Sequence, residues 1–364
     1  MSETRISVWR TALECGVVLV GCVVASSVAV GKTRLQGAGA TFPAPFYKRL
    51  VAVYQVQHPD QMIDYQSIGS GGGIRAITDK TVHFAASDAP MSKKELETTG
   101  GAANVVEFPS CAGGIVPTYN LPGMTASLKF SGELLADIYL GKVTQWNDPA
   151  IAQLNPDVQL PNTPITPVWR SDASGTTFVF TNYLCGQSEE FRSSVGMGKQ
   201  VQWPLGQGGK GNENVTAVVQ QTVGGIGYVE QSYADNNHLT YGLVKNKDGK
   251  FVKASPETVS HAGAGIAGSM SGQILAADIW NQSGSEAYPI SSFTYLVVYR
   301  DLNNLPDKES AQALVNFLWW ATHDGQKYAT ELDYAPLAPE VQAAVEQALK
   351  TVTYKGQALE IGKE

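Results

Sequence analysis

The chain has 364 residues, of which 43% are hydrophobic and 16% are charged. This composition excludes an intrinsically disordered chain and predicts one large or two medium globular domains with hydrophobic cores. The formal net charge of -7 argues against nucleic acid or an anionic membrane as the main partner, because both carry charge of the same sign.

Residues 1–29 have the pattern of a signal peptide for export. Arg5 and Arg10 precede an uncharged run of small and apolar residues over 16–30, which is shorter than a membrane-spanning helix requires. Near its end lies Ser27-Val28-Ala29, a small-x-small sequence typical of a cleavage site. The sequence therefore predicts an exported protein whose mature chain begins near residue 30.

Cys22 indicates an alternative for the N-terminus. The sequence Leu19-Val20-Gly21-Cys22 resembles a lipoprotein cleavage box, after which Cys22 would become the lipidated first residue. The residues that follow Cys22 remain apolar, whereas a lipoprotein usually has a polar tether at this point. We therefore prefer the cleaved signal peptide and keep a lipoprotein anchored through Cys22 as the alternative.

Cys111 and Cys185 are the cysteines beyond this leader. They could pair in an oxidising compartment, but they lie in different segments, and isolated buried thiols are the preferred interpretation. The sequence contains no C-x-x-C, and its five histidines follow no paired-ligand pattern. We therefore expect no metal site and no cofactor.

Predicted strands and helices alternate along the rest of the chain. Hydrophobic periodicity and turn residues predict strands over 33–39, 62–66, 82–86, 112–120, 165–169, 225–230 and 293–300. They predict helices that begin near residues 43, 73, 92, 131, 146, 174, 212, 311 and 339. This alternation indicates α/β architecture, and no linker or internal repeat divides the chain.

The stretch 170–177, Arg-Ser-Asp-Ala-Ser-Gly-Thr-Thr, lies between a predicted strand and a predicted helix. It combines a guanidinium, hydroxyl groups and a glycine with the first turn of a helix. The N–H groups of that turn have no intrahelical partner and carry partial positive charge, so they can bind an oxyanion. The ordinary alternative is a helix cap that satisfies its own helix and binds nothing.

Three other corners carry similar but weaker signals. Thr41 and Phe42 follow the first predicted strand, and the run 69–73 places Ser70 among glycines at the start of a helix. Asp88 lies at a strand end, and the next helix already has a capping box in Ser92 and Glu95, so it does not need Asp88 as a cap. Each corner by itself is also compatible with a cap or a solvated turn.

Motifs for several enzyme classes are absent or lack their required context. Two G-x-G-x-x-G matches, at 206–211 and 263–268, do not follow a convincing strand, as a dinucleotide site requires. The sequence contains no G-x-S-x-G nucleophile elbow and no G-x-x-x-x-G-K-[ST] phosphate loop. What remains is a set of anion-binding groups without a nucleophile, base or metal.

Taken together, the segments 37–43, 69–73, 86–90 and 170–176 resemble the phosphate-binding protein of bacterial ABC phosphate importers. The similarity continues, in the same order, over 137–142, 203–211, 224–230 and 332–335. The resemblance implies a type II periplasmic-binding-protein fold of the α/β class, with two lobes that are each a mixed sheet flanked by helices. The chain would cross between the lobes at a hinge, with 33–112 and 291–364 in lobe one and 113–290 in lobe two.

The resemblance also implies which residues bind phosphate. Asp172 would pair with Arg170 and steer it, and Asp88 would accept the proton of hydrogen phosphate while repelling sulfate, which has no proton to donate. The sequence departs from the usual family pattern at Ala173, where glycine is common, and at Gly71, where serine often follows the first serine. The implied phosphate ligands are Thr41, Phe42, Ser70, Asp88, Arg170, Ser174, Gly175 and Thr176.

The predicted function is high-affinity binding of inorganic phosphate outside the cytoplasmic membrane and its delivery to an ABC importer. The expected partners are inorganic phosphate and the membrane subunits of a permease with its ATPase subunits, and not nucleic acid. We expect a monomer without enzymatic activity. The alternatives are a binder of another tetrahedral oxyanion, such as sulfate or molybdate, and a secreted phosphatase-like protein that uses the same anion cradle.

Overall fold

The computed structural model describes residues 33–124 and 126–362. The predicted signal peptide over 1–29 and the alternative lipidation site at Cys22 lie outside these ranges. Within the described ranges, no helix combines the length and the apolar composition that crossing a membrane requires.

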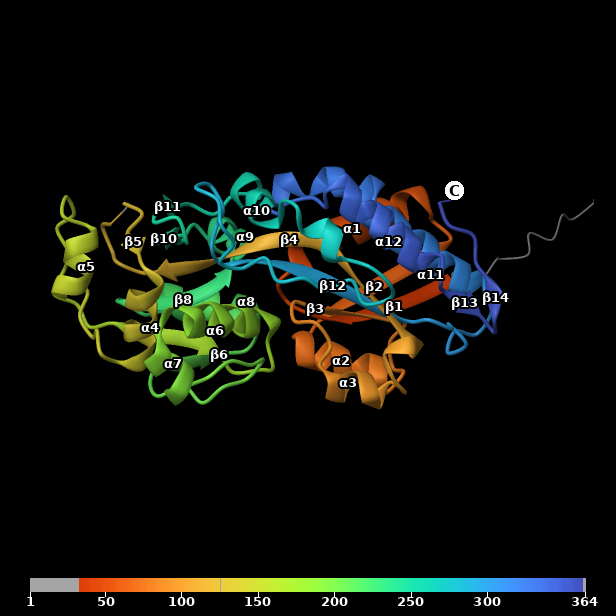
Figure 1. Cartoon of the computed structure of the whole chain (residues 1–364), viewed down its shortest axis with the longest axis horizontal. Helices are drawn as coiled ribbons and strands as arrows, with labels where there is room; N and C mark the ends of the chain where they lie inside the picture. The colour runs from red at the N-terminus through yellow and green to blue at the C-terminus, as the bar shows by residue number, and fades with distance from the viewer. Residues whose placement is uncertain (1–32, 125, 363–364) are drawn as a thin grey trace, which may run out of the picture. The chain divides into compact units, whose positions relative to one another are not determined.

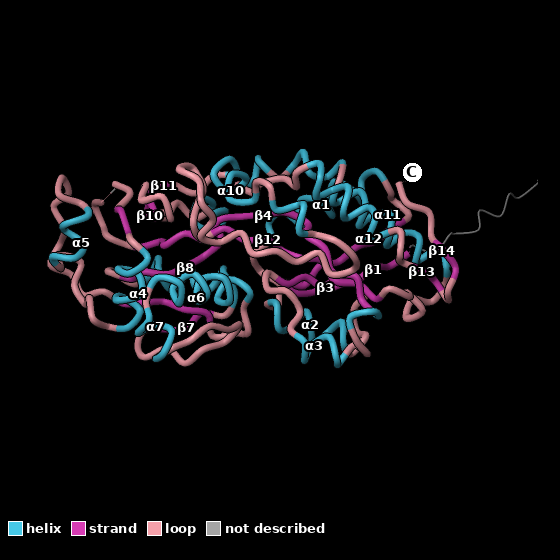
Figure 2. Tube along the Cα trace, viewed as in Figure 1, coloured by secondary structure: helices cyan, strands magenta, loops and turns pink. Residues whose placement is uncertain are grey.

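A mixed β-sheet runs through the described chain (Figure 1; strands in magenta in Figure 2). Its strands follow the order β2-β1-β3-β12-β4-β8-β6-β7, and β9 also pairs with β4. The strands are β1 Thr33–Gly39, β2 Gln61–Ser67, β3 Phe84–Ser87, β4 Val105–Tyr119, β6 Thr166–Arg170, β7 Gln207–Gly209, β8 Gly225–Glu230, β9 Thr240–Tyr241 and β12 Ser291–Tyr299.

Strand β4 joins two halves of this sheet. Its residues 105–114 pair with β12, and its residues 115–119 pair with β8, in both cases antiparallel. We call β2, β1, β3, β12 and the first part of β4 the first half, and the remainder of β4 with β8, β6, β7 and β9 the second half. Every residue of β4 is buried, so this strand lies in the interior of both halves.

The start of β4 differs from the sequence prediction, which placed the strand over 112–120. The structure begins it at Val105 and runs it through Pro109. Pro109 lies beside a β-bulge, where the register against β12 shifts between Thr294 and Tyr295. A proline is tolerated at a bulge because the ladder hydrogen bond it cannot donate is already interrupted there.

Helices follow most strands of both halves. In the first half, α1, α11 and α12 lie on one side of the sheet and α2 and α3 on the other (Figure 1). In the second half, α6 and α8 pack against β8. The helices are α1 Ala44–Gln57, α2 Ser70–Thr78, α3 Lys93–Thr98, α4 Gly132–Leu140, α5 Pro149–Leu154, α6 Gly175–Gln187, α7 Glu189–Ser194, α8 Gly211–Gln221, α9 Gln231–Asn236, α10 Pro256–Gly263, α11 Lys308–Thr322 and α12 Pro339–Leu349.

Smaller elements complete the described chain. A three-stranded sheet contains β5 Lys129–Phe130, β10 Leu243–Lys245 and β11 Phe251–Val252, and a hairpin contains β13 Thr353–Tyr354 and β14 Gln357–Ala358. Short 3-10 helices cover Ala102–Asn104, Ile266–Ser269, Asp324–Tyr328 and Thr330–Leu332.

The carboxyl ends of parallel strands position the helix starts that matter for function. Strand β1 pairs in parallel with β2 and β3, and β6 pairs in parallel with β7 and β8. The chain therefore leaves β1, β2 and β3 at one edge of the first half and leaves β6 at the corresponding edge of the second half. In open α/β sheets, ligands bind beside the carboxyl ends of such strands.

Helix α2 packs so close to the end of β1 that a side chain at position 73 of the helix would clash with the backbone of the strand. A Cβ on Gly73 would lie 2.5 Å from the Cα of Gly39 and 2.8 Å from the carbonyl oxygen of Ala38. The Gly39 carbonyl oxygen accepts hydrogen bonds from the N–H groups of Ile68 and Gly69, at 2.9 and 2.8 Å. These contacts fix the start of α2 beside the end of β1.

We predict that Gly73→Ala destabilises the protein by about 1–3 kcal/mol, because the added methyl overpacks a backbone contact that cannot yield. Urea unfolding of both proteins measures this. The matched control is Gly186→Ala in α6, where a Cβ meets no atom within 4 Å. That change should stabilise the protein by about 0.5–1 kcal/mol through helix propensity. A similar effect of the two substitutions on the free energy of unfolding would contradict the close approach.

Candidate functional site

The residues that the resemblance selected as ligands lie together in the fold, although they come from both halves of the sheet. Thr41 and Phe42 follow β1, Ser70 begins α2, and Asp88 follows β3. From the second half, Arg170 ends β6, Ser174 is the N-cap of α6, and Gly175 and Thr176 form its first turn. Every one of these residues is buried.

Direct hydrogen bonds join the two halves at this site. The Ser70 Oγ accepts the N–H of Gly175 at 3.1 Å and the N–H of Asp88 at 3.2 Å. The N–H of Gly71 donates to the carbonyl oxygen of Ala173 at 2.9 Å. The Ser70 hydroxyl therefore contacts both the strand end that carries Asp88 and the helix start that follows Arg170.

Gly71 and Ala173, the two departures from the usual family pattern, lie against each other. A Cβ on Gly71 would lie 2.4 Å from the Cβ of Ala173. Glycine at 71 therefore leaves the room that the methyl of Ala173 occupies. Ala173 is not among the described residues with positive φ, so the loop accepts alanine without left-handed strain.

Arg170 forms a bidentate ion pair with Asp172. Its Nε donates to Oδ1 at 2.8 Å and its Nη2 donates to Oδ2 at 2.6 Å, while Nη1 donates to Thr176 Oγ1 at 3.3 Å. The Gly211 N–H also donates to Asp172 Oδ1, at 3.0 Å. Burial alone disfavours the Asp172 carboxylate, but the hydrogen bonds and charge of Arg170 hold its pKa below the usual value. The pair fixes the guanidinium beside the start of α6.

Asp88 is a buried carboxyl group at the same site. Burial raises its pKa to about 7, although the hydrogen bond from Thr294 and the charge of Arg170 act in the opposite direction. Its Oδ1 accepts the Thr294 hydroxyl at 2.8 Å. A Cβ on Gly175 would lie 2.6 Å from its Oδ2, so the carboxyl group faces the start of α6. Near neutral pH, it is present in both its charged and its neutral form.

Several backbone donors at these corners have no acceptor in the protein. Within residues 33–124 and 126–362, the N–H groups of Phe42, Ser70 and Thr176 donate no hydrogen bond. Each belongs to a helix start or the turn before one, where N–H groups lack intrahelical partners. Buried donors of this kind cost free energy unless a ligand or water accepts from them. Together with Arg170, they are the candidate cradle for an oxyanion.

Two residues that the sequence analysis did not select complete the network. Asn212 in α8 donates through its backbone N–H and its Nδ2 to Thr41 Oγ1, at 3.1 and 2.8 Å, and its Nδ2 lies 3.2 Å from Thr176 Oγ1. Thr294 in β12 orients Asp88. Asn212 follows a glycine-rich turn at a helix start, the same signal that marked Ser70. Thr294 lies in an apolar strand and gives no such signal.

Comparisons with known proteins identify the family. A family model described as the PBP superfamily domain matches residues 26–323. The phosphate-binding protein PstS of Pasteurella multocida is 43% identical over 318 residues, which cover 87% of this chain and 90% of that protein. The PstS of Haemophilus influenzae is 42% identical over 322 residues, which cover 87% of this chain and 92% of that protein. The chain belongs to the PstS family of phosphate-binding proteins.

Solved structures agree on the fold of this PstS family member. A Clostridium perfringens protein, described as a phosphate ABC transporter substrate-binding protein with bound phosphate, superposes with a TM-score of 0.60 at 21% identity. The superposition covers 84% of this chain and 100% of that protein. The mixed α/β architecture is the type II periplasmic-binding-protein fold, as the sequence analysis expected.

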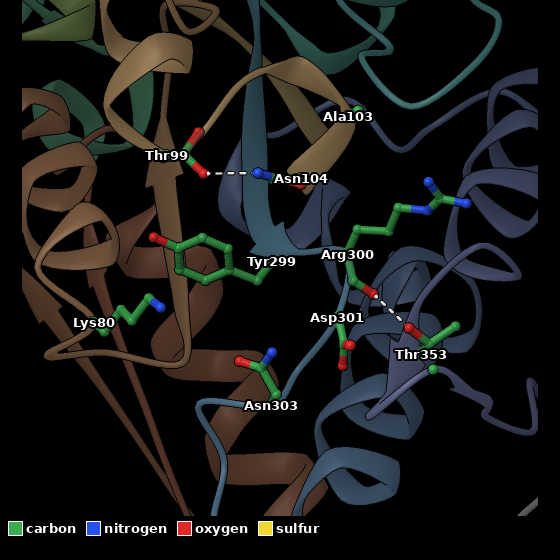
Figure 3. A pocket seen from close by; sticks show the side chains of 10 residues that line it. Lys80, Thr99, Ala103, Asn104, Tyr299, Arg300, Asp301, Asn303 and Thr353 are labelled. Carbon is green, nitrogen blue, oxygen red and sulfur yellow. Dashed lines mark hydrogen bonds between the residues drawn. The ribbon is translucent and has the colours of Figure 1, made fainter.

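A cavity of about 490 Å³ lies elsewhere in this family member (Figure 3). Its lining includes Lys80, Asn104, Tyr299, Arg300 and Asp301, and none of the predicted phosphate ligands. A small anion is bound by short, convergent hydrogen bonds. The buried cradle provides such donors, whereas this cavity is open to solvent.

Cys111 and Cys185 are free, buried thiols, which agrees with the preferred interpretation from the sequence. In the described part of the chain, no cluster of three or more His, Cys, Asp and Glu residues could hold a metal ion.

We predict that Asp172→Asn destabilises the protein by about 3–5 kcal/mol, because it leaves the buried Arg170 guanidinium without its counter-charge. Urea unfolding measures the loss. The control is Glu189→Gln, which breaks the ion pair with Arg192 at the surface and should cost less than about 1 kcal/mol. An Asp172→Asn protein as stable as the control would show that Arg170 does not depend on this carboxylate.

Proposed function

We propose that this protein captures inorganic phosphate and delivers it to an ABC-type phosphate importer. The observation that carries the proposal is that the buried N–H groups of Phe42, Ser70 and Thr176 have no acceptor, while hydrogen bonds of neighbouring side chains connect their corners to Arg170. The relatives named phosphate-binding protein PstS support it. The proposal includes the eight predicted ligands and the supporting role of Asp172.

The cradle binds a tetrahedral oxyanion through local charge and dipoles. The net charge of the chain is -7, so the protein as a whole repels anions, and attraction must come from nearby groups. Helix starts provide partial positive charge and N–H donors, and Arg170 provides a full charge with fixed geometry. Hydroxyl groups of Thr41, Ser70 and Thr176 adjust to the remaining oxygens.

Binding would involve the movement of two lobes. We place 33–112 and 291–364 in lobe one and 113–290 in lobe two, with β4 and the entry into β12 as the crossings between them. The ligands come from both lobes, so the cradle is complete only when the lobes are together. Closure of this kind around a ligand is the behaviour expected of the fold class.

Asp88 would select between phosphate and sulfate. Hydrogen phosphate has a proton to donate to the Asp88 carboxylate, whereas sulfate has none and would be repelled by it. Rejection of sulfate should therefore strengthen as the pH rises above about 7, where the Asp88 group is charged. The selectivity therefore lies in the first half of the sheet, opposite the arginine that attracts the anion.

The first prediction from this assignment is that Asp88→Asn allows sulfate to compete with phosphate, because an amide no longer repels sulfate and can donate a hydrogen bond to it. Titration calorimetry with each anion measures the selectivity. Glu107→Gln is the matched control, since Glu107 is also buried and burial also raises its pKa to about 7, but it lies outside the cradle. Unchanged selectivity in Asp88→Asn would remove the role given to Asp88.

The binding of sulfate should depend on pH. Because the folded-state pKa of Asp88 is raised to about 7, this group is protonated below that pH and charged above it. Residual sulfate binding should therefore weaken by about tenfold per pH unit as the pH rises above about 7, because sulfate requires the neutral carboxyl. Calorimetry with sulfate between about pH 6 and pH 9 tests this. The Asp88→Asn protein should lack the dependence, and a wild-type profile that is equally flat would contradict it.

The proposal also states that the protein is not an enzyme. Among the described residues, no histidine is hydrogen-bonded to a cradle residue, so the cradle serines have no adjacent general base of that kind. A colour-forming phosphomonoester tests the alternative of a phosphatase-like protein. If the wild type hydrolysed this substrate and Arg170→Ala did not, the result would favour a phosphatase-like protein over a phosphate-binding protein without enzymatic activity.

The location and partners follow from the same proposal. PstS-type proteins are periplasmic substrate-binding proteins. We propose that residues 1–29 are a cleaved signal peptide, that the mature protein is a monomer, and that it docks on the membrane subunits of a permease with ATPase subunits. Mass spectrometry of the mature chain distinguishes cleavage after residue 29 from lipidation at Cys22.

A further inference from the structure

Among the described residues, one ion pair joins the two halves of the sheet outside the phosphate cradle. Lys199 Nζ lies 2.6 Å from Glu95 Oε1. Glu95 belongs to α3 in the first half, and Lys199 belongs to the segment between α7 and β7 in the second half. The two residues are 104 positions apart in the sequence, so folding of either half alone cannot bring them together.

This pair is better shielded from water than the ion pairs on the protein surface. The side chains of Lys199 and Glu95 are 16% and 26% exposed, whereas those of Arg192 and Glu189 are 50% and 79% exposed. A pair with lower exposure is less screened and contributes more than a surface pair, which is often worth almost nothing. Its energetic effect should therefore be measurable.

The capping box of α3 orients Glu95 through contacts that do not involve Lys199. Glu95 Oε2 accepts the N–H of Ser92 at 2.8 Å as part of the capping box of α3. This leaves Oε1 directed toward Lys199. Burial alone would raise the pKa of Glu95, but the hydrogen bonds from Lys199 and Ser92 lower it, so the group is charged at neutral pH.

Lys199 is connected through its backbone to the helix start that holds the anion. Its carbonyl oxygen accepts the N–H of Ser174, the N-cap of α6, at 2.8 Å. The neighbouring Gly198 N–H donates to Thr181 Oγ1 within α6 at 3.2 Å. The position of Lys199 is therefore tied to α6, and the position of its ammonium group depends on the contact with α3.

We propose that Lys199 is a positioning residue for phosphate retention, whose ion pair with Glu95 forms on closure, holds α6 against the first half and slows the release of phosphate. This inference rests on the proposed phosphate binding and on the opening of the two lobes. The Lys199 side chain lies outside the cradle and contacts no predicted ligand, so its effect is exerted through the closed state. Stabilising only the closed state slows dissociation more than it speeds association.

The experiment measures the release of radiolabelled phosphate from the full mature protein into an excess of unlabelled phosphate. Lys199→Met removes the charge and keeps the length of the side chain, and Glu95→Gln removes the charge and keeps an acceptor for the capping box. Each variant should release phosphate about tenfold faster than the wild type, an effect between those of exposed and fully buried ion pairs. The double variant should release it no faster than either single variant.

Two further measurements separate this role from a general structural one. Lys142→Met is the control, because it removes the exposed ion pairs with Asp137 and Glu190 in the same half, and it should leave the release rate unchanged. The urea midpoint of the ligand-free protein should be the same in the wild type and in Lys199→Met, because the pair forms only in the closed state. Added salt should speed release from the wild type more than from the double variant.

The outcomes distinguish the inference from the proposed function. The inference would be overturned if Lys199→Met released phosphate at the same rate as the wild type. It would also be overturned if the increases in release rate of the two single variants multiplied in the double variant. The inference would also be overturned if Lys199→Met destabilised the ligand-free protein by as much free energy as it weakened the retention of phosphate. Failure of the proposed function would appear differently, as a wild type that binds no phosphate in calorimetry.

Discussion

The ion pair between Arg170 and Asp172 is the interaction on which the site depends. A guanidinium cannot be buried alone, because removing its charge from water costs several kcal/mol. Asp172 compensates this cost through two hydrogen bonds and is itself held by the N–H of Gly211. The pair is therefore close to neutral, and in the proposed site it leaves the backbone N–H groups and the free edge of the guanidinium available to an incoming anion. A cradle of this kind would have no excess of buried positive charge when it is empty.

The buried carboxyl group of Glu230 takes part in the contact between the halves. Burial raises the pKa of Glu230 well above its usual value. The Tyr334 hydroxyl lies 2.6 Å from the carbonyl oxygen of Phe42 and 2.8 Å from Glu230 Oε2. Glu230 Oε2 also accepts the N–H of Ser232 at 3.1 Å. Tyr334 therefore connects Glu230 in the second half to the loop that presents the Phe42 N–H.

The sequence was sufficient for the elements and corners that have local signals. The capping box of Ser92 and Glu95, the N-cap at Ser174 and the strand end before Asp88 are present as predicted, because each depends on a few neighbouring residues. The first part of β4 was missed because Pro109 and polar Glu107 and Ser110 interrupt its pattern, and its bulge and its partner β12 become visible only in three dimensions. Thr294 and Lys199 were missed for a related reason. Their partners, Asp88 and Glu95, are distant in sequence, and no spacing rule connects them.

Contacts between the two halves and unpaired donors in the cradle have opposite effects on a closed arrangement. The contacts include the bonds of Gly175 to Ser70, of Gly71 to Ala173 and of Asn212 to Thr41, and the pair of Lys199 with Glu95. The N–H groups of Phe42, Ser70 and Thr176 are buried without an acceptor, which costs about 1–3 kcal/mol each unless an anion or water accepts from them. An oxyanion that accepts from those donors would therefore favour the closed arrangement. In the proposed function, contacts outside the cradle affect how long that arrangement lasts, and the cradle affects which ion can form it.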